Sequence, residues 1–196
     1  MIRKFLLSYG LFGLLILSAC NSADGAVPAP VSSATPQTAV KSLPTSISPG
    51  KRIVYDDLQV AMSQAEITTS YLTEYGSTRE PSVGGKFLWI HVLLKNVGQR
   101  EQNLPAPEHF SVLYDATEFK STYGHRKGYV DYTTLKPVLY QGEEADAWLR
   151  FDIPIEAELK DLQFVFLPES SQVSVGFSSS DYSWGNHPIY LWMCAP

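Results

Sequence analysis

The sequence predicts an all-β protein whose folded part is an immunoglobulin-like antiparallel β-sandwich of about seven to eight strands. After the N-terminal apolar run, no stretch shows helical periodicity of useful length. Short runs of alternating apolar and polar residues recur instead, and turn-forming residues separate them, which is typical of a sandwich. Residues 51–196 have a length that suits one domain. We therefore expect a signal peptide and a linker to precede a single β-domain.

Residues 1–19 are predicted to be a signal peptide. Arg3 and Lys4 give it a positive start, and the apolar run over residues 5–17 is too short to span a membrane comfortably. The segment ends in Leu-Ser-Ala-Cys at Cys20, which resembles the lipobox of bacterial lipoproteins. In that family the cysteine is acylated and the chain is cut just before it. The resemblance implies lipidation of Cys20 and attachment to a membrane on the extracytoplasmic side of the cell envelope. An ordinary secretory signal or a single membrane anchor is the alternative.

Residues 20–50 are predicted to be a disordered tether. They are rich in Ala, Pro, Ser and Thr and hold few aromatic or large aliphatic residues. Such a composition buries too little apolar surface to offset the loss of conformational entropy on folding, and prolines favour an extended chain. We expect the tether to hold the domain away from the lipid.

Residues 84–98 form the longest β-favouring run of the domain and predict a central strand. Two glycines begin the run, and Asn-Val-Gly ends it with residues that tolerate turn geometry. One face is aliphatic and is expected in the core: Leu88, Ile90, Val92 and Leu94. The other face is mixed: Phe87, Trp89, His91, Leu93 and Lys95.

The other strands follow from the same alternation. An Asp-Ala-Thr turn at 115–117 predicts a hairpin between two of them, and a Gln-Gly-Glu turn at 141–143 precedes another. We expect all of them to pair antiparallel. The predicted runs are residues 58–63, 110–114, 118–123, 147–153, 162–166 and 173–177.

These runs also resemble a domain family, the telokin-like, immunoglobulin-like domains of bacterial lipoproteins, which includes a mycobacterial immunoprotective antigen. The resemblance rests on Lys-Asn-Val-Gly ending at Gly98, Phe-Ser-Val-Leu-Tyr-Asp from Phe110, Leu-Lys-Pro ending at Pro137, and Trp-Leu-Arg-Phe-Asp-Ile-Pro from Trp148. It covers residues 53–177 and implies the sandwich fold. Because the function of this family is largely unknown, the resemblance implies no activity.

Charge and motifs exclude several functions. Residues 51–196 hold 12 basic and 19 acidic side chains, and this net charge of −7 disfavours nucleic acid and anionic lipid headgroups as partners. The four histidines lie far apart, and no zinc motif, phosphate-binding loop or Gly-x-Ser-x-Gly elbow is present, so we predict no metal, no cofactor and no enzyme activity. The acidic run of Glu143, Glu144 and Asp146 lacks the ligand spacing of a calcium loop and indicates a solvated turn.

Cysteine usage indicates that no disulfide stabilises the domain. If Cys20 carries lipid, Cys194 has no partner within the mature chain. We expect Cys194 to be a buried or unreactive thiol, with a bond to another chain as the alternative.

Two aromatic-rich loops, residues 121–132 and 178–192, are the candidate ligand contacts, because loops carry binding in sandwiches and aromatic rings give contact area at low entropic cost. Glycan, peptide or protein is the expected ligand class. The alternative is that several of these rings cover the sheets. The candidate ligand-binding residues are Tyr123, Arg126, Tyr129, Tyr132, Tyr182 and Trp184.

Together these features predict a lipid-anchored cell-envelope protein with a non-catalytic binding or interaction domain. One alternative is an envelope hydrolase with an unrecognised site, which a cluster of histidine, acid and serine in a cleft would favour. The other is a structural spacer or antigen without a small ligand.

Overall fold

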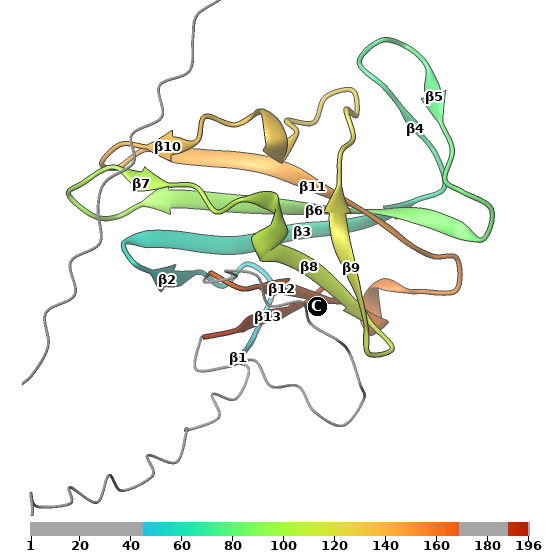
Figure 1. Cartoon of the computed structure of the whole chain (residues 1–196). Helices are drawn as coiled ribbons and strands as arrows, with labels where there is room; N and C mark the ends of the chain where they lie inside the picture. The colour runs from blue at the N-terminus through green and yellow to red at the C-terminus, as the bar shows by residue number, and fades with distance from the viewer. Residues whose placement is uncertain (1–44, 169–187, 196) are drawn as a thin grey trace, which may run out of the picture. The chain divides into compact units, whose positions relative to one another are not determined.

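The computed structural model of the protein describes residues 45–168 and 188–195 (Figure 1). These residues form thirteen strands and three short 3-10 turns, which confirms the all-β class. None of the helical turns in these ranges is long and apolar enough to cross a membrane. The predicted signal peptide, Cys20, most of the predicted tether, the predicted strand at 173–177, Tyr182 and Trp184 lie outside the described residues.

Nine strands form the main sheet, and two small pairs accompany it. The order in the main sheet is β1-β13-β12-β8-β9-β11-β6-β3-β2. Its strands are β1 (Thr45–Ile47), β2 (Ile53–Tyr55), β3 (Leu58–Thr68), β6 (Gly85–Asn96), β8 (Phe110–Tyr114), β9 (Thr117–Thr122), β11 (Glu144–Pro154), β12 (Gln163–Phe166) and β13 (Tyr190–Met193). The small pairs are β4 (Tyr71–Leu72) with β5 (Thr78–Arg79), and β7 (Gln102–Asn103) with β10 (Val138–Leu139). The 3-10 turns are η1 (Pro107–His109), η2 (Tyr132–Thr134) and η3 (Leu159–Asp161).

The main sheet curls into two layers at β9. This strand pairs with β8 over most of its length, but with β11 only at Ser121 and Thr122. As a result, β3, β6 and β11 lie above β12, β13 and β1 (Figure 1), with β2 paired to the upper layer and β8 to the lower layer. Side chains from both layers fill the space between them, so the predicted sandwich is confirmed. The buried core includes Val60, Met62, Ile90, Val92, Leu149 and Phe151 from the upper layer and Phe110, Val112, Phe164, Phe166 and Trp192 from the lower layer.

Strand β6 is the central strand of the upper layer, as predicted. It lies between β3 and β11, and its aliphatic face faces the core, with Ile90 and Val92 fully buried. Burial of this face is a major source of stability, at roughly 1.5–3 kcal/mol for each large aliphatic side chain. The strand ends at Asn96, whose buried side-chain amide donates to the carbonyls of Arg100 and Leu139 and accepts from the Gly98 amide. Asn96 therefore ties the end of β6 to β10.

Two hairpins use the same tight turn. Asp115 and Ala116 have φ of 44° and 59° and connect β8 to β9, which confirms the predicted hairpin. Asp56 and Asp57 have φ of 45° and 64° and connect β2 to β3 in the same way. Two central residues with positive φ match the right-handed twist of the flanking strands. The sequence pattern missed β2 because its three residues are too few to show alternation.

Three sequence-based expectations need correction. The domain includes Thr45–Ile47, which lies within the range predicted as tether, and Ile47 is buried in the core. This strand pairs parallel with β13, so the described part of the main sheet is not wholly antiparallel. A three-residue strand between prolines carries no periodic signal, and its partner lies at the other end of the chain. The last part of the predicted loop 178–192 is also strand, since Tyr190–Met193 form β13 and Trp192 is fully buried.

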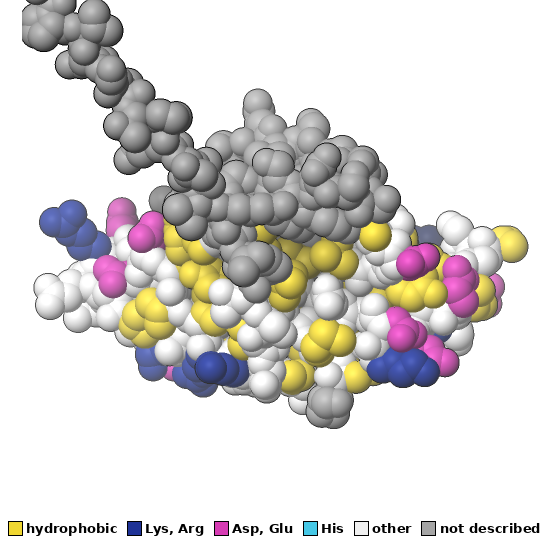
Figure 2. All heavy atoms as spheres, turned by 90° about the horizontal axis from the view of Figure 1, so that it is seen from below, with side chains coloured by type: hydrophobic (Ala, Val, Ile, Leu, Met, Phe, Trp, Pro, Cys, Tyr) yellow, Lys and Arg dark blue, Asp and Glu magenta, His cyan; other side chains and the backbone are white. Residues whose placement is uncertain are grey.

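The underside of the lower layer is the face seen in Figure 2. Hydrophobic side chains gather across its middle, and acidic and basic groups lie toward its two ends. The alternation of β8 and β13 directs the half-buried Leu113, Leu191 and Met193 to this side, away from Val112 and Trp192.

Candidate functional site

The candidate site lies on the outer face of the upper layer, which carries the mixed face of β6. In the register, Trp89 lies opposite Glu66 and Arg150, His91 lies opposite Gln64 and Trp148, and Leu93 lies opposite Ala61 and Asp146: these rows cross β3, β6 and β11. The sequence predicted the mixed face, but it did not predict that the two ends of this face have different surroundings. One half is covered by an aromatic cluster, and the other half is open.

The aromatic cluster covers the start of β6. Tyr71 contacts Phe87 and Trp89 edge to face, each with ring centroids 5.0 Å apart, and all three rings are buried. Tyr129 adds its ring against Trp89 at 5.7 Å and against Trp148 at 4.1 Å. Aromatic pairs with these geometries stabilise a fold beyond the area that they bury. The cluster is thus a second, smaller core on the outside of the sandwich.

Arg126 and Tyr129, two predicted ligand contacts, are brought together here. The Arg126 guanidinium lies 4.1 Å from the Tyr129 ring centroid and 5.4 Å from that of Trp89. It also forms an ion pair with Glu66, and the Tyr129 hydroxyl donates to the same carboxylate at 2.9 Å. Both side chains therefore hold the loop 121–132 against the sheet, which is the alternative that the sequence left open.

The other two described candidates have different surroundings. Tyr132 is a core residue, because its ring packs edge-on against Phe110 at 5.3 Å and its hydroxyl donates to the Pro105 carbonyl at 2.8 Å. Only 4 % of Tyr132 is exposed, and this burial raises the pKa of its hydroxyl, so the side chain lies in the core and not on the surface where the ligand contact was predicted. Tyr123 is 60 % exposed, and its hydroxyl shares a hydrogen bond with the His125 ring. Tyr129 and Tyr132 are separated by only two residues, yet they lie on opposite sides of the upper layer because the η2 turn begins at Tyr132.

Within the described residues, one serine lies in hydrogen-bond contact with a histidine, as a hydrolase would require: Ser63 contacts His91. Ser63 is the extra residue of a β-bulge in β3, and the bulge brings its hydroxyl to 2.6 Å from His91 Nδ1. Burial lowers the pKa of His91, and the nearby Asp146 opposes that shift. Among the described side chains, no hydrogen bond joins Asp146 to the imidazole, so the acid that orients the base in a triad is not in place. The imidazole thus shares a hydrogen bond with Ser63, and burial disfavours its charged form.

The imidazole also stacks on Trp148. Their ring centroids are 4.7 Å apart with an interplanar angle of 29°, and Tyr129 contacts the same indole. The contacts of His91 and Tyr129 with Trp148 thus cover part of the ring surface on which a sugar would stack.

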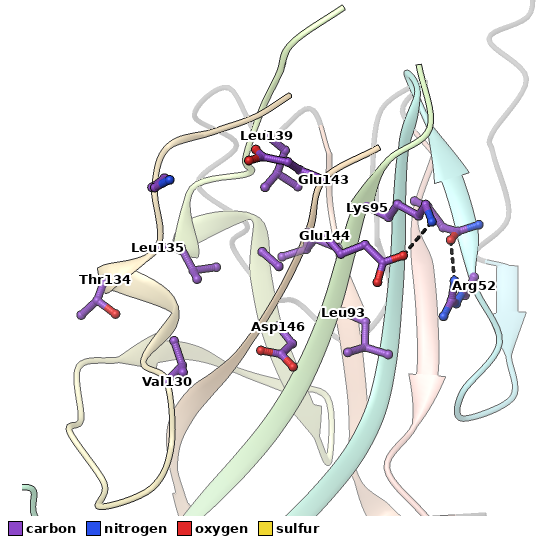
Figure 3. Close-up of a pocket in the computed structure, with 14 residues that line it drawn as sticks. Arg52, Leu93, Lys95, Val130, Thr134, Leu135, Leu139, Glu143, Glu144 and Asp146 are labelled. Carbon is purple, nitrogen blue, oxygen red and sulfur yellow. Dashed lines mark hydrogen bonds and ion pairs between the residues drawn. The ribbon is translucent and has the colours of Figure 1, made fainter. Parts of the chain in front are cut away.

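The open half of the face is a trough of about 560 Å³. Strands β6 and β11 form its floor, and the segment that leads into β10 forms one wall, with Val130, Leu135 and Leu139 facing Leu93 and Asp146 (Figure 3). Arg52 borders the opposite side (Figure 3), where its side chain donates to Gln59. The sequence offered no signal for this trough beyond the mixed face of β6, because its wall comes from a loop. The lining residues are Arg52, Gln59, Leu93, Leu94, Lys95, Val130, Thr134, Leu135, Lys136, Leu139, Glu143, Glu144, Ala145 and Asp146.

The wall of the trough is fixed by backbone hydrogen bonds and by one carboxylate. The Trp148 amide donates to the Val130 carbonyl at 2.8 Å, and the Leu104 amide donates to the Pro137 carbonyl at 2.8 Å. The buried Asp131 accepts from the amides of Thr133 and Gly124 at 2.8 and 3.1 Å. A wall held in this way is preformed, which lowers the entropic cost of binding a ligand.

Most charged side chains that line the trough already have an ion-pair or hydrogen-bond partner within the protein. Lys95 Nζ lies 2.6 Å from Glu144 Oε1, and this contact lowers the pKa of the Glu144 carboxyl. Arg52 donates to the Gln59 side chain at 2.9 Å, and Glu143 accepts from the Tyr140 amide at 2.8 Å. Among the described residues, no group of three His, Cys, Asp or Glu side chains could hold a metal ion. The acidic run at 143–146 is thus divided between an ion pair, a turn and the trough floor.

Comparisons with known proteins give the fold and no function. No protein-family model matches the sequence, and no curated protein matches it. The solved yjhA protein of Bacillus subtilis is 16 % identical, with 74 % of this chain and 97 % of that chain covered and a TM-score of 0.51. An uncharacterized β-sandwich protein of Clostridium difficile is 15 % identical, with 81 % and 98 % covered and a TM-score of 0.47. A Bacillus subtilis protein described as a candidate lipoprotein, ycdA, is 14 % identical, with 71 % and 37 % covered and a TM-score of 0.44.

Proposed function

We propose that this chain is a lipid-anchored protein of the cell envelope whose β-sandwich binds an extended peptide segment of a partner protein. The observation that carries the proposal is the preformed trough on the outer face of the upper layer. Its volume lies within the range of small-molecule and peptide sites, and its floor and wall combine apolar side chains with a few charged groups. The domain acts by binding and performs no catalysis.

A peptide suits this trough better than a glycan. Sugars bind on open aromatic faces, but Trp148 packs against Tyr129 and stacks on His91, and none of the described residues that line the trough is aromatic. Aliphatic side chains such as Leu93, Val130 and Leu135 match the apolar side chains of a peptide in extended form. Charged groups of both signs at the rim match its polar groups.

The anchor is proposed from the sequence. The Leu-Ser-Ala-Cys ending at Cys20 supports acylation, and the proline-rich tether that follows would allow the domain to reach partners beyond the lipid surface. The alternative of a hydrolase has less support, because the Ser63–His91 contact lacks an orienting acid and lies outside the trough lining.

Site-specific photo-crosslinking in the cells that produce the protein tests the proposal. A photo-reactive amino acid is placed at Val130, on the trough wall, or at Ile155, in the turn that follows β11 and outside the trough lining. The two positions are matched, because their side chains are 49 % and 56 % exposed. We expect a protein adduct from position 130 and none from position 155.

A blocking variant completes this test. Leu93→Arg fills the trough floor from a half-buried position and should remove the adduct at position 130 while the domain keeps its melting temperature within a few degrees. Equal adducts at positions 130 and 155, or an adduct that persists with Leu93→Arg, would contradict the proposal and favour a spacer.

A further inference from the structure

We infer that the partner segment carries a lysine or arginine side chain that docks on the Asp146 carboxylate; this inference rests on the proposed function and specifies its ligand. Asp146 lies on the trough floor in β11, directly opposite Leu93 in the register. In Figure 3 its carboxylate faces the hollow between Val130 and Leu93. A carboxylate at this place can accept a charge-assisted hydrogen bond from a bound cation.

Asp146 differs from the other two carboxylates of the trough. Glu144 is engaged by Lys95, and Glu143 by the Tyr140 amide. Asp146 forms no hydrogen bond or ion pair with any described side chain, although its charge acts on His91. It is therefore the trough carboxylate that remains available to a ligand.

None of the described basic side chains that line the trough forms an ion pair with Asp146. Lys95 lies opposite Glu144 in the register and is paired with it, and Arg52 reaches Gln59 on the far side of the trough. Lys136 is exposed on the wall and forms no ion pair within the described residues. Lys136 can receive a carboxylate or a carbonyl of the same bound segment, so the trough is bipolar.

The apolar flanks select the kind of cation. The aliphatic stem of a lysine or arginine can lie along Leu93 and Val130 while its charged end reaches Asp146. The net charge of −7 over residues 51–196 adds a long-range attraction for a basic segment. A compact inorganic cation would use none of this apolar surface.

A peptide array probed with the full chain in detergent micelles tests the inference. The array holds extended decapeptides of randomised sequence as pairs that differ only at one central position, lysine in one member and glutamine in the other. For the pairs that bind, we expect the lysine member to bind about tenfold more tightly than the glutamine member. This ratio corresponds to the lower limit of the free energy of a hydrogen bond to a charged group, which applies because Asp146 is exposed to solvent. Asp146→Asn should abolish this difference.

Glu156→Gln is the matched control, since it removes one exposed carboxylate from the turn after β11, outside the trough lining. It should retain the tenfold preference. Lysine and glutamine members that bind equally, or a preference that survives Asp146→Asn, would overturn this inference and leave the proposed function standing. If no peptide of either kind binds, the proposed function itself is contradicted.

Discussion

Replacement of Tyr132 distinguishes a core residue from a ligand contact. Tyr132→Phe removes the hydroxyl that donates to the Pro105 carbonyl at 2.8 Å, while the ring keeps its contact with Phe110. Loss of one such hydrogen bond should lower the free energy of unfolding by about 1 kcal/mol. Tyr132→Ala also removes the buried ring, and substitutions of this kind cost roughly 3–5 kcal/mol.

These changes translate into melting temperatures. For a domain of this size, 1 kcal/mol corresponds to about 2–4 °C, so we expect losses of about 2–4 °C for Tyr132→Phe and roughly 6–20 °C for Tyr132→Ala. Thermal unfolding of the purified chain, followed by near-ultraviolet circular dichroism, measures both shifts. Tyr123→Ala is the control, because Tyr123 is 60 % exposed and should change stability by less than about 0.5 kcal/mol. If Tyr132→Ala melted with the wild-type protein, the assignment of Tyr132 to the core would be refuted.

Three further predictions concern pH, the central strand and the anchor. Because burial lowers the pKa of His91 below its usual 6.5, the unfolded state takes up a proton first, so stability should fall between pH 7 and pH 5. His91→Gln should reduce this loss of stability, as measured by the urea midpoints at pH 7 and pH 5. If the loss is the same in the variant, it is caused by other titratable groups. Ile90→Asp should prevent folding because it buries an unpaired charge, whereas Gln59→Asp, half-buried beside Arg52, should stay within about 0.5 kcal/mol of wild type in thermal melts. A folded Ile90→Asp variant would show that the face of β6 is misassigned. Cys20→Ala should abolish labelling by a fatty-acid analogue and release the protein from membranes, and equal labelling of the variant would contradict the proposed anchor.

Strand faces are the part of this fold that could be predicted, and the reason is geometric. Side chains along a strand alternate between two faces, so the positions of Ile90 and Val92 in the core follow from local order alone. The Asp115-Ala116 hairpin was predictable for a similar reason, since the turn and both strands lie within a few residues. Neither feature depends on a distant part of the chain.

Loop residues could not be assigned in this way. Arg126, Tyr129 and Tyr132 share one aromatic-rich loop, which gave them the same predicted role. In the structure, Arg126 and Tyr129 cover the outer face through Glu66, while Tyr132 enters the core beside Phe110. A loop has no repeating period, so the destination of each side chain depends on contacts with strands far away in the sequence.

By itself, the sequence determined the all-β class, the core face of β6 and the expectation of a lipid anchor at Cys20, since each depends on a short contiguous pattern. Only the tertiary structure decided that Thr45–Ile47 joins the sheet beside β13, and that β6 and β11 meet the segment around Leu135 to form a trough. Those outcomes require pairing between segments separated by tens of residues or more. Such pairing depends on the packing of the whole domain, and it cannot be inferred from a short stretch of sequence.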